Sequence, residues 1–560
     1  MNRQSASRAS LACWPCRTQH LKCDAALPIC ARCQTLLKAC SYPESRRSGR
    51  YKAANSRRKQ HKISCLASHV LTPSDTHTSV LGGEDHDHSS VSTSSQIPLA
   101  SAIEVENSMG ANNTLLDLYY EYFHRSHPFV LPRPNLKAKL ASEWSSLRAL
   151  LAVMQYIGSS YGEGDSSSRR ERMPDEQSID VVDGFVVQTT LLLALAKSMC
   201  AERAASEVLL AKSIEQARLI GMHTRAFADV AAENDPVLAE SWRRTWWMLY
   251  LADLNFSVIR YDFITSIHDT DHDVDLPCDD LDYCATDIPR TRASSIDYRN
   301  REYALATTRF SSFAYLIDAT RIFVCSLRVA TQYENPPKAE LLCSDLEASI
   351  VGWFVMLPPD KWELAVQPDL LDQLIFQAHM MMYTALAYIH RPLSNLQYDP
   401  AEDLSSCGTP PRPLVSSTIT TGAFNHRTHS DKLFQAVRNQ NQCLILLPLG
   451  AAQLSPFLIC MIACCTIAYL VACKSGLTPD EVEVARSRIR VCLGTLKHYE
   501  NIWPRAKNIL HELRVIANAL MRADSVPRAP STGFDLLAEQ DAMVANIFDG
   551  EWLHALGSMT

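Results

Sequence analysis

The chain has 560 residues, of which 47% are hydrophobic, and a formal net charge of −7 at pH 7. This length allows several domains. The first residues, MNRQSASRAS, contain no apolar stretch of the kind that a secretory signal needs, so we do not expect a disulfide framework formed in an oxidising compartment.

Six cysteines near the start of the chain follow a repeated spacing. The pattern C-x2-C-x6-C occurs twice, and the second copy begins 17 residues after the first. Structural zinc takes four ligands, so three thiols per copy serve two zinc ions only if two of the thiols bridge. A single four-thiol zinc ribbon is the alternative, but it leaves two cysteines unused. The six candidate ligands are Cys13, Cys16, Cys23, Cys30, Cys33 and Cys40.

The charge of the chain is unevenly distributed. Residues 1–62 hold 14 Lys and Arg against two acids, Asp24 and Glu44, which gives a net charge of +12 and leaves −19 for the remainder. Six thiolates with two Zn²⁺ change this local charge by only −2. Such a basic segment is typical of a protein that binds a polyanion such as DNA.

With this spacing the segment resembles the fungal binuclear zinc cluster transcription regulators. The features that carry the resemblance are the six cysteines together with Arg17, Lys22, Asp24, Pro28 and Ser41-Tyr42-Pro43. The resemblance implies two structural zinc ions per chain and bridging roles for the first and fourth cysteines, Cys13 and Cys30. It also implies that a helix at about Trp14–Leu21 enters the major groove of double-stranded DNA and reads a CGG-like half-site.

The sequence departs from the family inside that helix. Gln19 and His20 stand where the family has two central basic residues. His20 can donate a hydrogen bond to a guanine, but it is not a fixed charge, so we expect altered base readout by Gln19 and His20. Arg17 and Lys22 are expected to contact phosphate.

A basic linker is expected over residues 44–64, followed by a disordered linker over residues 65–112. Too few apolar residues follow the basic linker at helical spacing to form a coiled coil, so a homodimer stays open but is not predicted by this route. The basic linker holds two clusters typical of a bipartite nuclear-localisation signal, with nonspecific phosphate contact as the alternative. These clusters are formed by Arg46, Arg47, Arg57, Arg58 and Lys59.

Residues 113–524 are predicted to form one large all-α domain. The segment from Phe185 reads as two helices, with Gly221 as the stop of the second. Residues 240–259 place Trp246, Trp247 and neighbouring apolar residues largely on one side of a helix. The order of such segments resembles the middle regulatory domain of the same family, which is all-α. The predicted fold class is therefore mostly α, with a small zinc module in front.

Three patterns in this region invite other readings. The uncharged run from Phe457 to Cys473 is at the lower limit of a membrane span, but a buried core helix with cysteines acting as small hydrophobes is the better reading. Ser160 lies in a G-x-S-x-G pattern that is followed by a polar loop, which argues against a hydrolase. The acidic cluster in residues 268–275 is expected to supply loop and cap residues. No catalytic constellation appears, so we do not expect an enzyme.

The C-terminal residues 525–560 combine acidic and apolar side chains, and no Lys or Arg follows Arg528. Acids keep neighbouring apolar groups solvated and available to a partner groove, which is typical of an activation segment that recruits the transcription machinery. An amphipathic helix folded back on the regulatory domain is the alternative. The candidate contact residues are Phe534, Leu537, Phe548 and Trp552.

Together these features predict a nuclear, zinc-dependent, sequence-specific DNA-binding regulator without a membrane partner. An RNA polymerase II activator specific for one secondary-metabolite gene cluster is the favoured form. The alternative is a zinc-cluster corepressor or scaffold with weakened base readout.

Overall fold

The computed structural model describes residues 16, 22–26, 30–35, 113–140, 142–162, 182–267, 272–303, 309–364, 371–408, 412–414, 426–447, 454–475 and 477–522. The chain divides into two compact units, Met1–Thr93 and Ser94–Thr560. The predicted nuclear-localisation residues, the linker over residues 65–112 and the C-terminal activation segment lie outside the described residues.

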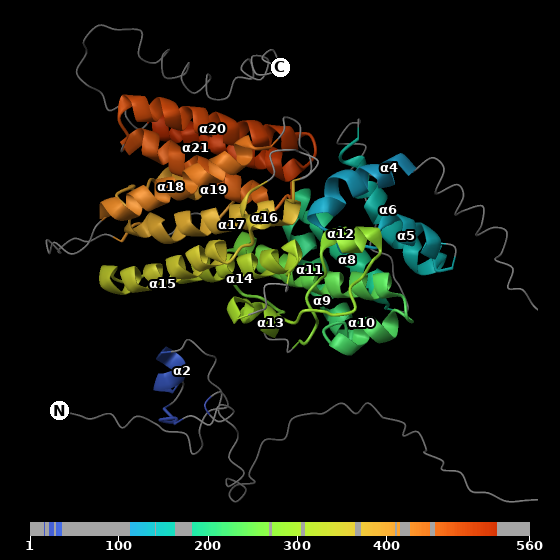
Figure 1. The fold of residues 1–560 in the computed structure, drawn as a ribbon. Helices are drawn as coiled ribbons and strands as arrows, with labels where there is room; N and C mark the ends of the chain where they lie inside the picture. Colours follow the sequence, from blue (N-terminus) through green and yellow to red (C-terminus); the bar gives the residue numbers. More distant parts are fainter. Residues whose placement is uncertain are drawn as a thin grey trace, which may run out of the picture. The chain divides into compact units, whose positions relative to one another are not determined.

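The second unit is built from helices, and no β-strand occurs in its described part (Figure 1). Its first half contains α4 (Asn113–Leu118), α5 (Arg133–Leu140), α6 (Trp144–Ser159), α8 (Gly184–Met199), α9 (Arg203–Leu219), α10 (Arg225–Ala231), α11 (Pro236–Arg260), α12 (Asp280–Ala285) and α13 (Ser295–Arg299). Its second half contains α14 (Ser312–Ala330), α15 (Pro336–Val355), α16 (Pro359–Trp362), α17 (Gln373–His390), α18 (His426–Ile445), α19 (Leu458–Ser475), α20 (Pro479–Glu500) and α21 (Pro504–Arg522). Short π and 3₁₀ turns join them: η1 (Tyr119–Phe123), η2 (His124–Ser126), η3 (Arg301–Tyr303), η5 (Arg391–Leu393) and η6 (Pro400–Leu404).

Many of these helices begin at a residue whose side chain caps free backbone N–H groups. Asp235 caps α11 and Asn335 caps α15, each directly before a proline at the first helical position. Thr478 and Glu481 form a reciprocal capping box at the start of α20. Such side chains satisfy donors that the first helical turn leaves unpaired. Helix α9 ends at Leu219 and Gly221 has a φ of 79°, so the predicted stop is confirmed.

Helix α11 is buried on all its faces, not only on the predicted apolar side. Every residue from Val237 to Ser257 is buried. Two arginines of the helix share one acidic partner: the Glu240 carboxylate binds Arg244 at 3.0 Å and Arg243 at 2.9 Å. Arg244 also donates to the backbone oxygens of Pro128 and Cys278, at 3.0 and 2.8 Å. Because these partners neutralise the buried charges of Glu240, Arg243 and Arg244, the fold can enclose the helix on all sides.

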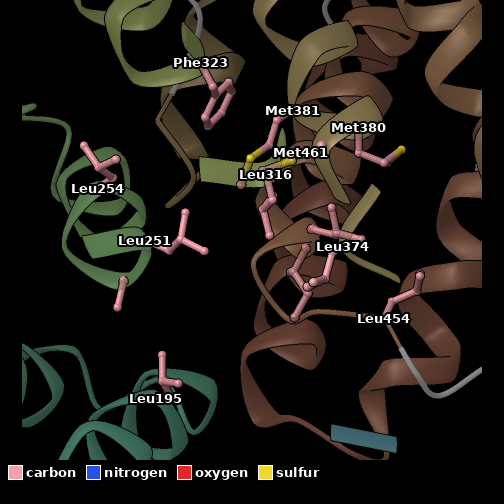
Figure 2. Packing of buried hydrophobic residues seen from close by; sticks show 14 of the residues in the cluster. Leu195, Leu251, Leu254, Leu316, Phe323, Leu374, Met380, Met381, Leu454 and Met461 are labelled. Carbon is pink, nitrogen blue, oxygen red and sulfur yellow. The ribbon is translucent and has the colours of Figure 1, made fainter. Parts of the chain in front are cut away.

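The two halves of the domain share one hydrophobic core. Helix α11 packs against α8, α9, α10 and α14, while α17 packs against α14, α15, α18 and α19. Figure 2 shows buried apolar side chains that these helices contribute to the core. Leu195 comes from α8, Leu251 from α11, Leu316 from α14, Met381 from α17 and Met461 from α19. The core therefore joins helices that are far apart in the sequence.

The uncharged run from Phe457 to Cys473 forms most of α19, whose apolar residues are buried in this core or packed against it. The prediction of a core helix is confirmed. None of the helices in the described part of the chain is long and apolar enough to cross a membrane. Ser160 of the G-x-S-x-G pattern directly follows the end of helix α6, and no strand precedes it, as the nucleophile turn of a hydrolase would require.

Candidate zinc- and DNA-binding site

Four of the six predicted zinc ligands are described, and they lie close together. The Sγ of Cys16 is 3.8 Å from that of Cys30 and 4.0 Å from that of Cys33. A tetrahedral zinc with Zn–S bonds of about 2.3 Å separates its sulfurs by about 3.8 Å. The thiols thus have the spacing that zinc requires. Cys13 and Cys40 lie outside the described residues.

Cys30 belongs to the second cysteine repeat but lies among thiols of the first. The ligand atoms of Cys16, Cys23 and Cys30 all lie within 4.8 Å of one another, and Cys30 is completely buried. Cys30 also precedes helix α2 (Ala31–Thr35), which carries Cys33 of the second repeat. A thiol in this place can face two metal ions.

Two backbone N–H groups at the start of α2 support this arrangement. The N–H of Cys33 donates to the Sγ of Cys30 at 3.3 Å, and such a bond favours a thiolate. The N–H of Ala31 donates to both carboxylate oxygens of Asp24, at 3.1 and 3.3 Å. Asp24 follows the third cysteine, so this bond ties the first repeat to the second. The sequence marked Asp24 only as a family feature and did not reveal this capping role.

The DNA-contact predictions are placed only in part. Lys22, directly before Cys23, is exposed to solvent. Arg32 on α2 is also exposed, and sequence reasoning did not single it out. Arg17, Gln19 and His20 lie outside the described residues.

Comparisons with known proteins agree with this geometry. Residues 11–49 match the fungal Zn(2)-Cys(6) binuclear cluster domain, and residues 178–335 match the fungal specific transcription factor domain. The chain is 26% identical to the C6 finger domain transcription factor iacK of Pestalotiopsis fici, over 97% of this chain and 85% of that protein. No solved structure matches the chain.

The two matched regions are the domains that define the fungal binuclear zinc cluster transcription factors. With these two domains the chain is a DNA-binding transcription regulator with two structural zinc ions, and it is not an enzyme. The matched residues 178–335 extend from just before α8 to just before α15 of the helical domain.

The helical domain of this zinc cluster factor contains an apolar cleft where α8, α11, α14, α17, α19 and α21 converge. The cleft holds about 690 Å³ of empty space, counting the solvent at its mouth. Phe323, Met461 and Leu195 line it, together with Cys460 and Arg505.

Cys460 is not the inert small hydrophobe that the sequence predicted. Arg505 donates a hydrogen bond to its Sγ at 3.0 Å. The pKa of Cys460 is lowered by a hydrogen bond from Cys407 and by the Arg505 charge, although burial opposes this. The pKa of Cys407 is raised by the same thiol pair and by burial. Of the two thiols, Cys460 is therefore the one whose ionisation its surroundings favour.

The acidic segment after α11 has the cap role that was expected of it. The Asp273 carboxylate accepts the backbone N–H of Arg225 at 2.7 Å, at the start of α10. The Asp275 carboxylate pairs with the Arg225 side chain at 2.7 Å. His268, Asp269 and Asp271 lie outside the described residues.

Proposed function

We propose that this chain is a nuclear, zinc-dependent, sequence-specific activator of RNA polymerase II transcription. The observation that carries the proposal is the doubled C-x2-C-x6-C repeat, whose described thiols have the separations of a zinc–thiolate cluster.

All six cysteines are the zinc ligands in this proposal, and Cys13 and Cys30 bridge the two ions. The burial of Cys30 and its place beside Cys16 support the bridging role. Zinc supplies the folding free energy of a module whose core is too small to fold alone. The chain's own groups, Asp24 and the N–H of Cys33, then hold the start of α2 and its thiols in place.

The basic charge of residues 1–62 attracts the DNA backbone, and we assign the individual contacts by position in the cysteine repeat. Arg17 and Lys22 contact phosphate, and the exposure of Lys22 supports its role. Gln19 and His20 read base edges, with a preference that departs from strict CGG half-sites.

The remaining segments complete the regulator. The proposed divisions are 1–43 for the zinc cluster, 44–64 for the nuclear-localisation linker, 65–112 for a disordered linker, 113–524 for regulation and 525–560 for activation. The activation segment would bind a coactivator through its apolar residues. We further propose that the protein controls one secondary-metabolite gene cluster. Deletion of its gene tests this, because the transcripts of one contiguous set of genes should then fall.

The test is selection from random duplex DNA by the full-length, zinc-loaded chain at near-physiological salt, because salt sets the nonspecific background. One enriched motif supports the proposal, and two half-sites at fixed spacing would indicate a homodimer. Binding without any enriched motif contradicts it. That result favours the second candidate function, a corepressor or scaffold, which rests on Gln19 and His20 in place of basic residues.

A further inference from the structure

A second group of metal-ligating side chains lies in the helical domain, apart from the zinc module. Cys343 from α15, His390 from α17 and His429 from α18 are all buried, and their ligand atoms lie within 4.8 Å of one another. The Nδ1 atom of His390 is 3.0 Å from the Nδ1 of His429 and 3.3 Å from the Sγ of Cys343. Three helices therefore bring one thiol and two imidazoles to a common point.

A carboxylate lies near the Nε2 atom of each imidazole. The Nε2 of His429 is 2.7 Å from Glu340 Oε2, and the Nε2 of His390 is 3.9 Å from Glu347 Oε2. Lys432 pairs with Glu347 at 2.7 Å. A carboxylate behind a histidine fixes its tautomer and orients the other ring nitrogen, and metal sites use this arrangement widely.

The ring protons cannot satisfy this geometry when both imidazoles are neutral. His429 must donate from Nε2 to the Glu340 carboxylate, so its Nδ1 carries a lone pair. If His390 donates from Nδ1 to that lone pair, its own Nε2 is left bare, buried and facing Glu347. If His390 is instead protonated on Nε2, two lone pairs face each other at 3.0 Å. Within the described residues the Nε2 of His390 has no hydrogen-bond partner.

We propose that Cys343, His390 and His429 bind a divalent, borderline-soft transition metal ion such as Zn²⁺, as a third metal site of the chain. A cation at the common point accepts both Nδ1 lone pairs and the Cys343 thiolate. Both Nε2–H groups then point toward carboxylates. A single extra proton shared by the two imidazoles is the rival occupant, and in that case the Cys343 thiol only donates to the backbone oxygen of Ile389, at 3.6 Å.

The distances fit zinc. Zn–N bonds of about 2.0–2.1 Å and a Zn–S bond of about 2.3 Å in a tetrahedron place the nitrogens about 3.3 Å apart and sulfur about 3.5 Å from nitrogen. The corresponding separations here are 3.0 and 3.3 Å. Three protein ligands leave the fourth position to water, as in open zinc sites. Glu340 is half-exposed, so the site lies just beneath the surface and an ion can enter beside it.

The site would act by joining three helices. Helix α18 packs against α17 and α20, and α15 packs against α14 and α17. An ion held by α15, α17 and α18 therefore stabilises the second half of the regulatory domain and makes its stability depend on free zinc.

Metal analysis of the full-length chain tests the proposal. The protein is reconstituted with Zn²⁺, freed of excess ion by gel filtration and measured for zinc per chain. The expected result is three zinc ions in the wild type and two in Cys343→Ala and in His429→Gln. Two matched controls remove a buried cysteine from α18, Cys443→Ala, and a buried histidine from α17, His379→Gln. Both control variants should keep three zinc ions per chain.

A wild type that binds only two zinc ions overturns the inference, even if a variant fails to fold, and so does a Cys343→Ala chain that keeps three. Cadmium-113 NMR of the full-length wild type supplies an independent readout. A resonance shielded relative to the all-thiolate cluster, because nitrogen ligands replace sulfur, supports the site; its absence contradicts it. Either failure leaves DNA selection intact, so it is distinguishable from failure of the proposed function.

Discussion

Arg244 offers a direct test of how the regulatory domain is held together. Its guanidinium is fully buried, pairs with Glu240 at 3.0 Å and with Asp280 at 2.5 Å, and lies 4.1 Å from the ring centre of Tyr283. It also donates to two backbone carbonyls in two different loops. The substitution Arg244→Ala removes all of these contacts at once.

The expected cost is about 3–5 kcal/mol of the free energy of unfolding, the range for removing one partner of a buried ion pair. The buried Glu240 keeps two donors, Arg243 and the N–H of Cys278, which limits the loss. The two orphaned carbonyls act in the other direction. Because a domain has about 5–15 kcal/mol in total, the variant should be close to the threshold of stability.

Urea unfolding followed by tryptophan fluorescence measures the change. The matched control is Arg203→Ala, since Arg203 also pairs with a glutamate four residues away, at 2.9 Å, but is about half-exposed. Such a surface pair is worth about 0.2–1 kcal/mol. If Arg244→Ala costs no more than Arg203→Ala, the buried network is not what joins α11 to its loops.

Three further predictions follow from individual side chains. Burial lowers the pKa of His124 to about 3 from an ordinary value of 6.5, so the full stability is present above pH 6.5 and each pH unit below that costs about 1.4 kcal/mol of unfolding free energy. The substitution His124→Phe should therefore flatten the fall of unfolding free energy between about pH 6.5 and 4, and an unchanged slope would refute this. At pH 7 iodoacetamide should modify Cys460 faster than Cys473, a half-buried thiol on the same helix whose pKa burial raises to about 11. In a mass-spectrometric time course, Arg505→Met should remove this difference in rate. Equal rates for the two thiols in the wild type would contradict a Cys460 thiolate. His20→Lys should tighten DNA binding and raise the preference for CGG, and an unchanged selected motif would mean that His20 does not read bases.

The sequence predicted those parts of the fold that depend on local pattern. The uncharged run of α19 and the stop at Gly221 were both readable, because burial of a whole helix and a left-handed residue leave marks within one segment. The spacing of six thiols likewise predicted the zinc cluster, since all the ligands lie in one short stretch. Asp24 capping α2 was less visible, because Asp24 and Ala31 are seven positions apart in the sequence.

Contacts between distant segments could not be predicted. The pKa of Cys460 is lowered by Cys407 and Arg505, which lie 53 and 45 residues away in the sequence, so the sequence alone assigned Cys460 an inert role. The group of Cys343, His390 and His429 is drawn from three helices, and no spacing within any one of them suggests a metal. In both cases tertiary packing supplies the neighbour that changes the chemistry.

The central claim is that zinc holds the basic module in a form that reads a DNA sequence. The most direct test is fluorescence anisotropy of the full-length chain on its selected duplex and on a scrambled duplex, at about 0.15 M salt, before and after chelation and again after zinc is restored. The account predicts a preference for the selected duplex that disappears on chelation and returns with zinc. A preference that survives the loss of zinc would contradict it.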